Sequence, residues 1–203
     1  MSRTIWAVLA ILALAFAILT GLAMRRGMFA PQGQTVAIGG PFQLTDQQGR
    51  PQTDAALKGK WSAVFFGYTY CPEACPTTLL ALGQTERALG PKAADFQTVF
   101  VSVDPERDTP KVMANYLSNT SFPRHALGLT GTPDQVAQIA RAYHVFYQKA
   151  GSGQAYEVNH STITYLMNPK GRFACALPYG AAPDVLTAKI KAAMAQGSGA
   201  ERC

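Results

Sequence analysis

The first long hydrophobic stretch of the chain covers residues 5–24, where only Thr20 and Gly21 interrupt a run of apolar side chains. About 20 such residues cross a bilayer as one helix. A cleaved signal peptide normally has an apolar core of only about 7–15 residues, and residues 27–30 make a poor small-x-small cleavage site. The pattern therefore favours an uncleaved transmembrane anchor over a signal peptide.

Beyond residue 40, short apolar runs alternate with stretches of helical periodicity. Strands are predicted from these runs at residues 42–45, 63–66, 96–103, 126–129, 161–167 and 172–177. Helices are predicted to start at residues 77, 110, 133 and 183. Thr109 and Thr132 each precede a proline, as a helix cap does. Strands alternating with helices, with the last two strands joined by a turn, predict an α/β layered domain with a mixed central sheet.

This organisation gives the expected boundaries of the parts. We expect a short flank at residues 1–4, a transmembrane anchor at 5–26, a linker at 27–40, the α/β domain at 41–196 and a disordered tail at 197–203. The linker is rich in glycine, glutamine and proline, which is typical of a tether. Within the domain, an extra hairpin is predicted before the main sheet at residues 42–53, and a hairpin loop at residues 145–158.

The charge balance narrows the class of partner. Three of the 18 basic residues flank the predicted anchor, and the rest of the chain carries 15 basic against 12 acidic residues, a net charge of +3. This part contains no lysine and arginine block of the kind found in nucleic-acid-binding arms, so we expect no nucleic-acid partner. The flanking arginines nearly balance, so the positive-inside rule does not settle the orientation of the anchor.

The strongest candidate for chemistry is the pair Cys71 and Cys75, which follows a buried strand at the start of a helix. The partial positive charge of a helix N-terminus stabilises thiolates. Side chains four residues apart on a helical turn lie about 5–6 Å apart, close enough to share a ligand, or to form a disulfide after a modest backbone adjustment. Two thiolates prefer Cu(I), zinc or an iron–sulfur cluster, and a distant group must complete any zinc site. The motif alone leaves open a structural disulfide, a redox pair and half of a metal site.

Three histidines are available as a further ligand. His125 lies in a loop, and His144 ends a helix among aromatic residues and is expected to be a packing residue. His160 immediately precedes a predicted strand, so it can lie at a sheet edge near the end of another strand. Only His160 therefore has a positional argument for a functional role.

The other candidate residues have simpler interpretations. Asp104 and Asp108 flank a turn, where aspartate commonly caps the following helix. Cys175 lies in a predicted strand and is expected to be a small buried hydrophobic residue. Cys203 is expected to be a free thiol on a mobile tail. Four cysteines are too few for a disulfide scaffold, and a cysteine pair beyond a membrane anchor indicates redox or metal chemistry outside the cytosol.

Four longer motifs continue in one register between residues 42 and 193: FGYTYCPEACPTT at 66–78, VSVDPERDTP at 101–110, GLTGTP at 128–133 and YLMNPKGRF at 165–173. Together they resemble the SCO/SenC family, the copper chaperones of cytochrome oxidase assembly. The resemblance implies a thioredoxin-like fold with one N-terminal transmembrane helix. It also implies an inner or cytoplasmic membrane, with the domain on the periplasmic or extracytoplasmic side.

The resemblance further implies one copper ion, Cu(I) or Cu(II), bound by Cys71, Cys75 and His160. The implied function is to deliver copper to the binuclear copper site of a cytochrome c oxidase subunit, with other copper chaperones as further partners. The alternative is a thiol–disulfide oxidoreductase that keeps the cysteines of that site reduced; a chaperone would be a carrier and not an enzyme. Asp104 and Asn159 are expected to lie just outside the ligands. Family members commonly carry aspartate where this chain has Asn159, so we expect weaker retention of Cu(II), the harder ion.

Overall fold

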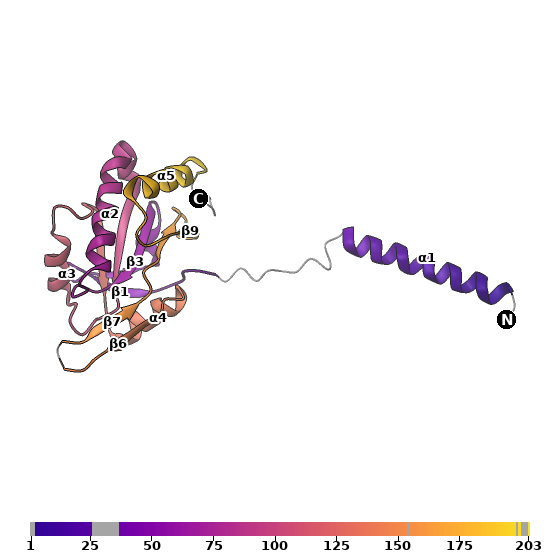
Figure 1. The fold of residues 1–203 in the computed structure, drawn as a ribbon, viewed down its shortest axis with the longest axis horizontal. Helices are drawn as coiled ribbons and strands as arrows, with labels where there is room; N and C mark the ends of the chain where they lie inside the picture. Colours follow the sequence, from indigo (N-terminus) through magenta and orange to yellow (C-terminus); the bar gives the residue numbers. More distant parts are fainter. Residues whose placement is uncertain (1–2, 26–36, 154, 198, 200–202) are drawn as a thin grey trace. The chain divides into compact units, whose positions relative to one another are not determined.

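The computed structural model describes residues 3–25, 37–153, 155–197, 199 and 203 of the chain (Figure 1). It forms two compact units, divided between Val36 and Ala37. Most of the predicted linker, residues 27–36, lies outside the described residues.

The described residues of the first unit form one helix, α1 (Arg3–Arg25). Its segment Ile5–Leu22 is long and apolar enough to cross a membrane, and none of it is buried in the protein. Alanine and leucine dominate the helix, and both are strong helix formers. A helix that is hydrophobic all round matches the predicted anchor, whose place in a membrane stays a prediction.

The second unit is built on a seven-stranded sheet with the order β2-β1-β5-β4-β3-β8-β9. Its strands are β1 (Gln43–Asp46), β2 (Pro51–Thr53), β3 (Trp61–Gly67), β4 (Phe96–Ser102), β5 (Ala126–Thr130), β8 (Thr164–Met167) and β9 (Phe173–Leu177). The three central strands β3, β4 and β5 run parallel, and the other pairings are antiparallel. The predicted mixed sheet is therefore confirmed, and the predicted N-terminal hairpin, β1–β2, joins it at one edge.

Helices cover both faces of the sheet. They are α2 (Ala74–Leu89), α3 (Pro110–Leu117), α4 (Pro133–Ala142) and α5 (Pro183–Ala195), with 3₁₀ turns η1 (Asp54–Leu57) and η2 (Gly90–Asp95). Val64 and Phe66 of β3 pack on the face covered by α4, whereas Ala63 and Phe65 pack on the face covered by α2, α3 and α5. This alternation follows from the two-residue period of a strand. Every residue of β3 is buried, as expected for a central strand covered on both sides.

The predicted helix caps at Thr109 and Thr132 are confirmed: each side chain accepts a hydrogen bond from the first turn of its helix. The start of α2 differs from the prediction, because the helix begins at Ala74 and so includes Cys75. The reason is local. The backbone N–H of Cys75 donates to Sγ of Cys71 at 3.4 Å, so the thiol takes the place of an ordinary cap.

The segment between α4 and β8 forms a hairpin of its own. Strands β6 (Tyr147–Ala150) and β7 (Glu157–His160) pair only with each other in the described sheets. The hairpin was predicted, but its second strand extends to His160, and β8 starts at Thr164 rather than at Ser161.

The C-terminal region requires two corrections. Cys203 was expected to be a free thiol, and this is wrong: its sulfur is bonded to that of Cys175, with the two Cα atoms 5.8 Å apart. Both residues pack at the margin of the core beneath α2 and α5. Cys175 was expected to be a small buried hydrophobic residue, whereas it is half-buried and forms this disulfide. On α5, Leu186 and Ile190 are buried and Val185 is exposed.

Candidate metal centre

The two cysteines lie at the carboxyl end of β3, as the sequence predicted. Cys75 is fully buried in the first turn of α2, and Cys71 is half-buried in the preceding loop. Gly67, the last residue of β3, makes room for them: a Cβ atom there would lie 2.5 Å from Sγ of Cys75 and 2.8 Å from Cε2 of Phe100. Only glycine allows the sulfur to pack this closely against the end of the strand.

His160 reaches the cysteines from the end of the separate hairpin. Its ring packs edge-on against Tyr68 and Phe65, with centroids 5.8 and 6.2 Å away. Nδ1 lies 2.9 Å from the carbonyl oxygen of Ser161, which only accepts hydrogen bonds, so Nδ1 carries the proton. The other ring nitrogen, Nε2, then faces Sγ of Cys75 at 3.6 Å. Such a bond from the far nitrogen is the usual way in which a metal-binding histidine is oriented.

The three candidate ligand atoms lie within 4.8 Å of one another. Bonds of about 2.3 Å to sulfur and about 2.0 Å to nitrogen put three ligands around one ion about 3.7–4.0 Å apart. Small side-chain movements therefore suffice to bind a metal ion. Two sulfurs and one nitrogen form a donor set suited to a soft ion such as Cu(I).

The two thiols differ in acidity. Hydrogen bonds from the Cys75 thiol, from His160 and from the N–H of Cys75 outweigh burial and lower the pKa of Cys71 to about 4. The pKa of Cys75 is raised, first because its thiol donates to Cys71 and then because it is buried. At neutral pH the pair therefore holds one proton, and a metal ion that binds both sulfurs must displace it.

Asp108 positions the loop that carries Cys71, a role that sequence reasoning missed. Its buried carboxylate accepts hydrogen bonds from the N–H of Thr69 at 3.0 Å, from the Thr69 hydroxyl at 2.6 Å and from the Ser102 hydroxyl at 2.6 Å. The prediction that Asp108 caps a helix is wrong, because Thr109 caps α3. An aspartate in a turn is a common pattern, and no signal in the sequence separates a cap from a buried brace.

The other candidate residues lie outside the three-ligand cluster. The buried carboxylate of Asp104 is bonded to the Arg107 guanidinium and to the Tyr156 hydroxyl. Asn159 is exposed on β7, and because neighbouring side chains on a strand alternate, it points away from the face of His160. The predicted influence of Asp104 and Asn159 on a metal stays a prediction.

The remaining histidines are not brought to the cysteines. Nδ1 of His125 lies 2.7 Å from a carboxylate oxygen of the buried Glu86. His144, which was expected to pack among aromatic residues, is exposed, and its Nε2 lies 3.2 Å from the carbonyl oxygen of Ala37. The positional argument thus selected the one histidine that the structure places beside Cys71 and Cys75.

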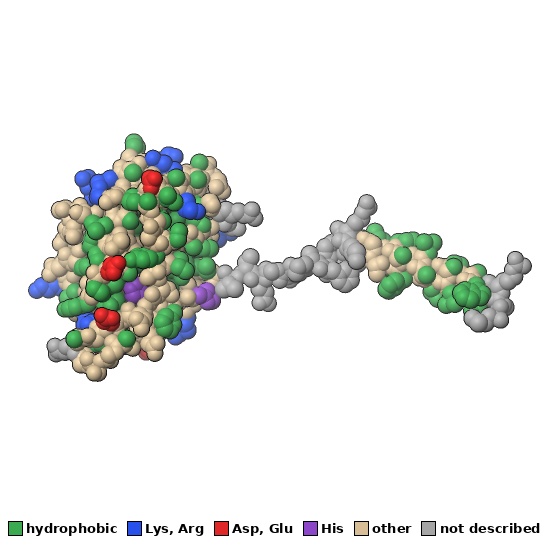
Figure 2. Space-filling view, viewed as in Figure 1, with side chains coloured by type: hydrophobic (Ala, Val, Ile, Leu, Met, Phe, Trp, Pro, Cys, Tyr) green, Lys and Arg blue, Asp and Glu red, His purple; other side chains and the backbone are tan. Residues whose placement is uncertain are grey.

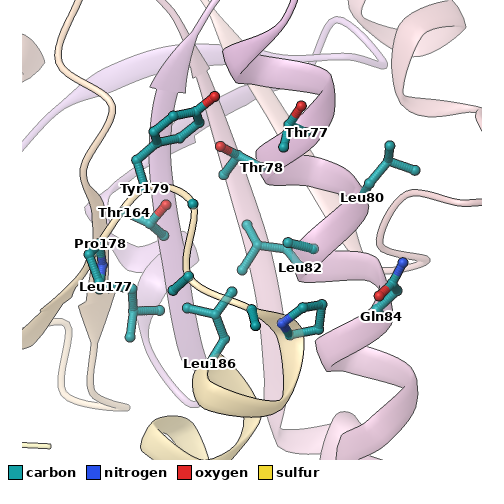
Figure 3. A pocket seen from close by; sticks show the side chains of 15 residues that line it. Thr77, Thr78, Leu80, Leu82, Gln84, Thr164, Leu177, Pro178, Tyr179 and Leu186 are labelled. Carbon is teal, nitrogen blue, oxygen red and sulfur yellow. The ribbon is translucent and has the colours of Figure 1, made fainter.

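A cavity of about 320 Å³ lies beside α2, beginning at Thr77 and Thr78 just after Cys75 (Figure 3). Leu82 and Leu186 form part of its apolar wall, and the exposed ring of Tyr179 lies across it from α2. Figure 2 shows hydrophobic side chains covering much of one face of the domain.

The sequence model of the SCO1/SenC family matches residues 30–195. The chain is 43% identical over 147 residues to the mitochondrial protein SCO2 of Saccharomyces cerevisiae, an alignment that covers 70% of this chain and 48% of the relative. Among the first curated relatives it spans between 43% and 61% of their length.

Solved structures show the same fold. ScoI of Bradyrhizobium japonicum with copper bound is 44% identical, with a TM-score of 0.71, and the match covers 77% of this chain and 99% of that chain. Yeast Sco1 with copper bound is 37% identical, with a TM-score of 0.74, and the match covers 81% and 92%. The α/β domain therefore has the thioredoxin-like fold that the motifs implied.

Proposed function

Because the chain belongs to the SCO1/SenC family, we propose that it is a membrane-anchored copper chaperone in which Cys71, Cys75 and His160 bind one copper ion. Sco proteins are cytochrome c oxidase assembly proteins. The single observation that carries the proposal is the convergence of two sulfur atoms and one imidazole nitrogen within 4.8 Å, although His160 lies 85 residues beyond Cys75 in the sequence.

The arrangement of the three side chains suits uptake and release. Cys71 is half-buried and already favours the thiolate, so it is the natural first contact for an incoming ion. Cys75 then gives up its proton, and Nε2 of His160 lies beside its sulfur as the third ligand atom. A site with only three ligands and one accessible side lets the thiols of a partner replace the ligands one at a time.

We further propose that the recipient is the binuclear copper site of a cytochrome c oxidase subunit, and that other copper chaperones supply the ion. The apolar helix α1 supports a single-pass anchor that holds the domain near a membrane-bound oxidase. In this arrangement the domain lies on the periplasmic or extracytoplasmic side, where a chaperone would meet an oxidase copper site that faces away from the cytoplasm.

The test is an anaerobic Cu(I) titration of the reduced full-length chain in detergent, using a chromophoric Cu(I) chelator as competitor. We expect one ion per chain, and binding weakened at least about 10-fold in Cys71→Ser, Cys75→Ser and His160→Ala, because each loses one of three ligands. His125→Ala is the matched control, since His125 lies outside the cluster, and it should bind like the parent. Unchanged affinity in His160→Ala would refute the three-ligand site.

A second function, thiol–disulfide exchange, is favoured by the unequal thiols. The Cys71 thiolate would attack a target disulfide and release one target thiolate, and Cys75 would then attack the mixed disulfide. The products are a Cys71–Cys75 disulfide and a reduced target, so two electrons pass from this protein to the target. His160→Ala separates the two functions: it should abolish tight copper binding, whereas reduction of a model disulfide, which needs only the two cysteines, should persist.

A further inference from the structure

His160 lies on a strand that is not part of the main sheet. Strand β7, which ends at His160, pairs with β6 in a separate two-stranded sheet (Figure 1). An isolated two-stranded hairpin is at best marginally stable in water. Contacts between side chains of the hairpin and the rest of the domain must therefore hold the histidine near the cysteines.

One such contact is made by Arg107, in the turn after β4. Its guanidinium carbon lies 3.6 Å from the ring centroid of Tyr156, which directly precedes β7. Its Nη1 donates to the carbonyl oxygen of Tyr156 at 3.0 Å. Only 16% of the Arg107 side chain is exposed, and a cation on an aromatic face contributes more when water is excluded.

Asp104 contacts both Arg107 and Tyr156. Its carboxylate accepts hydrogen bonds from Nε of Arg107 and from the hydroxyl of Tyr156. All three groups are thereby joined in a closed ring of interactions that links the turn after β4 to the start of β7. Networks of this kind, with charged partners and little solvent, are stronger than exposed pairs.

The same guanidinium also reaches the loop that carries Cys71. The ring centroids of Tyr70 and Tyr68 lie 4.7 and 5.8 Å from its central carbon. Tyr68 in turn packs edge-on against the ring of His160. Arg107 therefore touches both segments whose ligands must meet, although it is itself no ligand.

We infer that Arg107, held by Asp104 and Tyr156, is a positioning residue that fixes the His160 hairpin against the cysteine loop. This inference rests on the proposed function only for its effect on copper; the effect on the hairpin belongs to the metal-free protein.

The neighbouring Lys149 provides a matched control. Its Nζ lies 4.1 Å from the ring centroid of Tyr156 and 2.6 Å from a carboxylate oxygen of Glu106. Both members of that ion pair are substantially exposed, at 45% and 61%. Exposed pairs contribute little to stability, so removing this cation should leave the hairpin in place.

The first experiment measures amide hydrogen exchange by mass spectrometry in the metal-free full-length chain. Arg107→Met introduces an apolar side chain of similar length, which lacks the positive charge and the hydrogen-bond donors of the guanidinium. We expect exchange in residues 147–160 to become at least about 10-fold faster, with the central strands unchanged. Tyr156→Phe, which removes only the hydroxyl bond to Asp104, should shift exchange in the same direction by less, and Lys149→Met should match the parent. Unchanged hairpin exchange in both Arg107→Met and Tyr156→Phe overturns the inference.

The second experiment measures Cu(I) affinity in a double-mutant cycle. Arg107→Met should weaken binding about 10-fold when His160 is present, and should have no further effect in the His160→Ala background. In the single variant Arg107→Met, the nitrogen contribution to the copper X-ray absorption spectrum should fall. Equal losses in both backgrounds would mean general damage to the site and would contradict the inference. If His160→Ala itself binds like the parent, the proposed three-ligand site fails, and the exchange experiment still decides the role of Arg107.

Discussion

Gly67→Ala tests how tightly the end of β3 determines the place of Cys75. The added methyl group would lie 2.5 Å from Sγ of Cys75, 2.8 Å from Cε2 of Phe100 and 3.2 Å from Cε1 of Phe65. Optimal contacts between carbon atoms are about 3.5–4.0 Å. At least one of these neighbours must therefore move by about 1 Å.

The cost follows from the lack of free space. Cys75, Phe65 and Phe100 are all fully buried, and the two rings are stacked with centroids 5.9 Å apart. Overpacking of a well-filled core typically costs 1–3 kcal/mol, and with rigid neighbours on both sides we expect about 2–3 kcal/mol. Ligand positions need to be held within about 0.5 Å, so Cu(I) affinity should fall at least about 10-fold as well.

Two measurements on the full-length chain in detergent check this prediction: urea unfolding followed by tryptophan fluorescence, and Cu(I) competition. Gly40→Ala is the matched control, because a Cβ there meets only Cβ of Ala142, at an ordinary 3.5 Å. If Gly67→Ala is as stable as Gly40→Ala and binds Cu(I) like the parent, the argument from close packing is wrong.

Three further predictions follow from separate features. Cys203→Ser opens the loop closed by the disulfide to Cys175, which spans 28 residues. Under oxidising conditions this should lower the free energy of unfolding by about 3–4 kcal/mol. A difference in unfolding free energy between parent and variant that persists after reduction of the parent would contradict this. Burial raises the pKa of Asp108 in the folded protein, so the folded state holds the proton more tightly and stability falls as the pH rises from the ordinary carboxyl pKa to the raised one. Asp108→Asn should abolish this pH dependence of the unfolding free energy, and it should speed up hydrogen exchange in the loop around Thr69. If the pH dependence is unchanged, another titratable group is responsible for it. Asn159→Asp should slow the loss of Cu(II) to a chelator more than that of Cu(I), and equal effects on the two ions would exclude a charge effect.

The parts of the fold that the sequence predicted well are those governed by local rules. The apolar run at 63–66 is typical of a covered strand, and Thr132 followed by Pro133 is a common start of a helix. The start of α2 was predicted three residues late, because the cap is supplied by the sulfur of Cys71, an atom that ordinary capping rules do not consider. The bond between Cys175 and Cys203 was also missed, since nothing in the local sequence of a short tail indicates where its end packs.

The candidate metal centre shows the same contrast between features set by local sequence and features set by contacts between distant segments. The cysteine pair is a local motif, and its place after a strand and before a helix could be predicted from its neighbours. His160 is different, because it lies on a hairpin that belongs to no larger sheet, and no periodicity says where such a hairpin will lie. What fixes it is a set of contacts between distant segments, among them Arg107 against Tyr156 and the ring of Tyr68 against the imidazole. A residue such as Arg107 binds no metal and caps no helix, so a search for ligands passes over it. If the exchange experiment supports its role, the proposed copper site depends as much on the contacts that hold the His160 hairpin against the cysteine loop as on its three candidate ligand atoms.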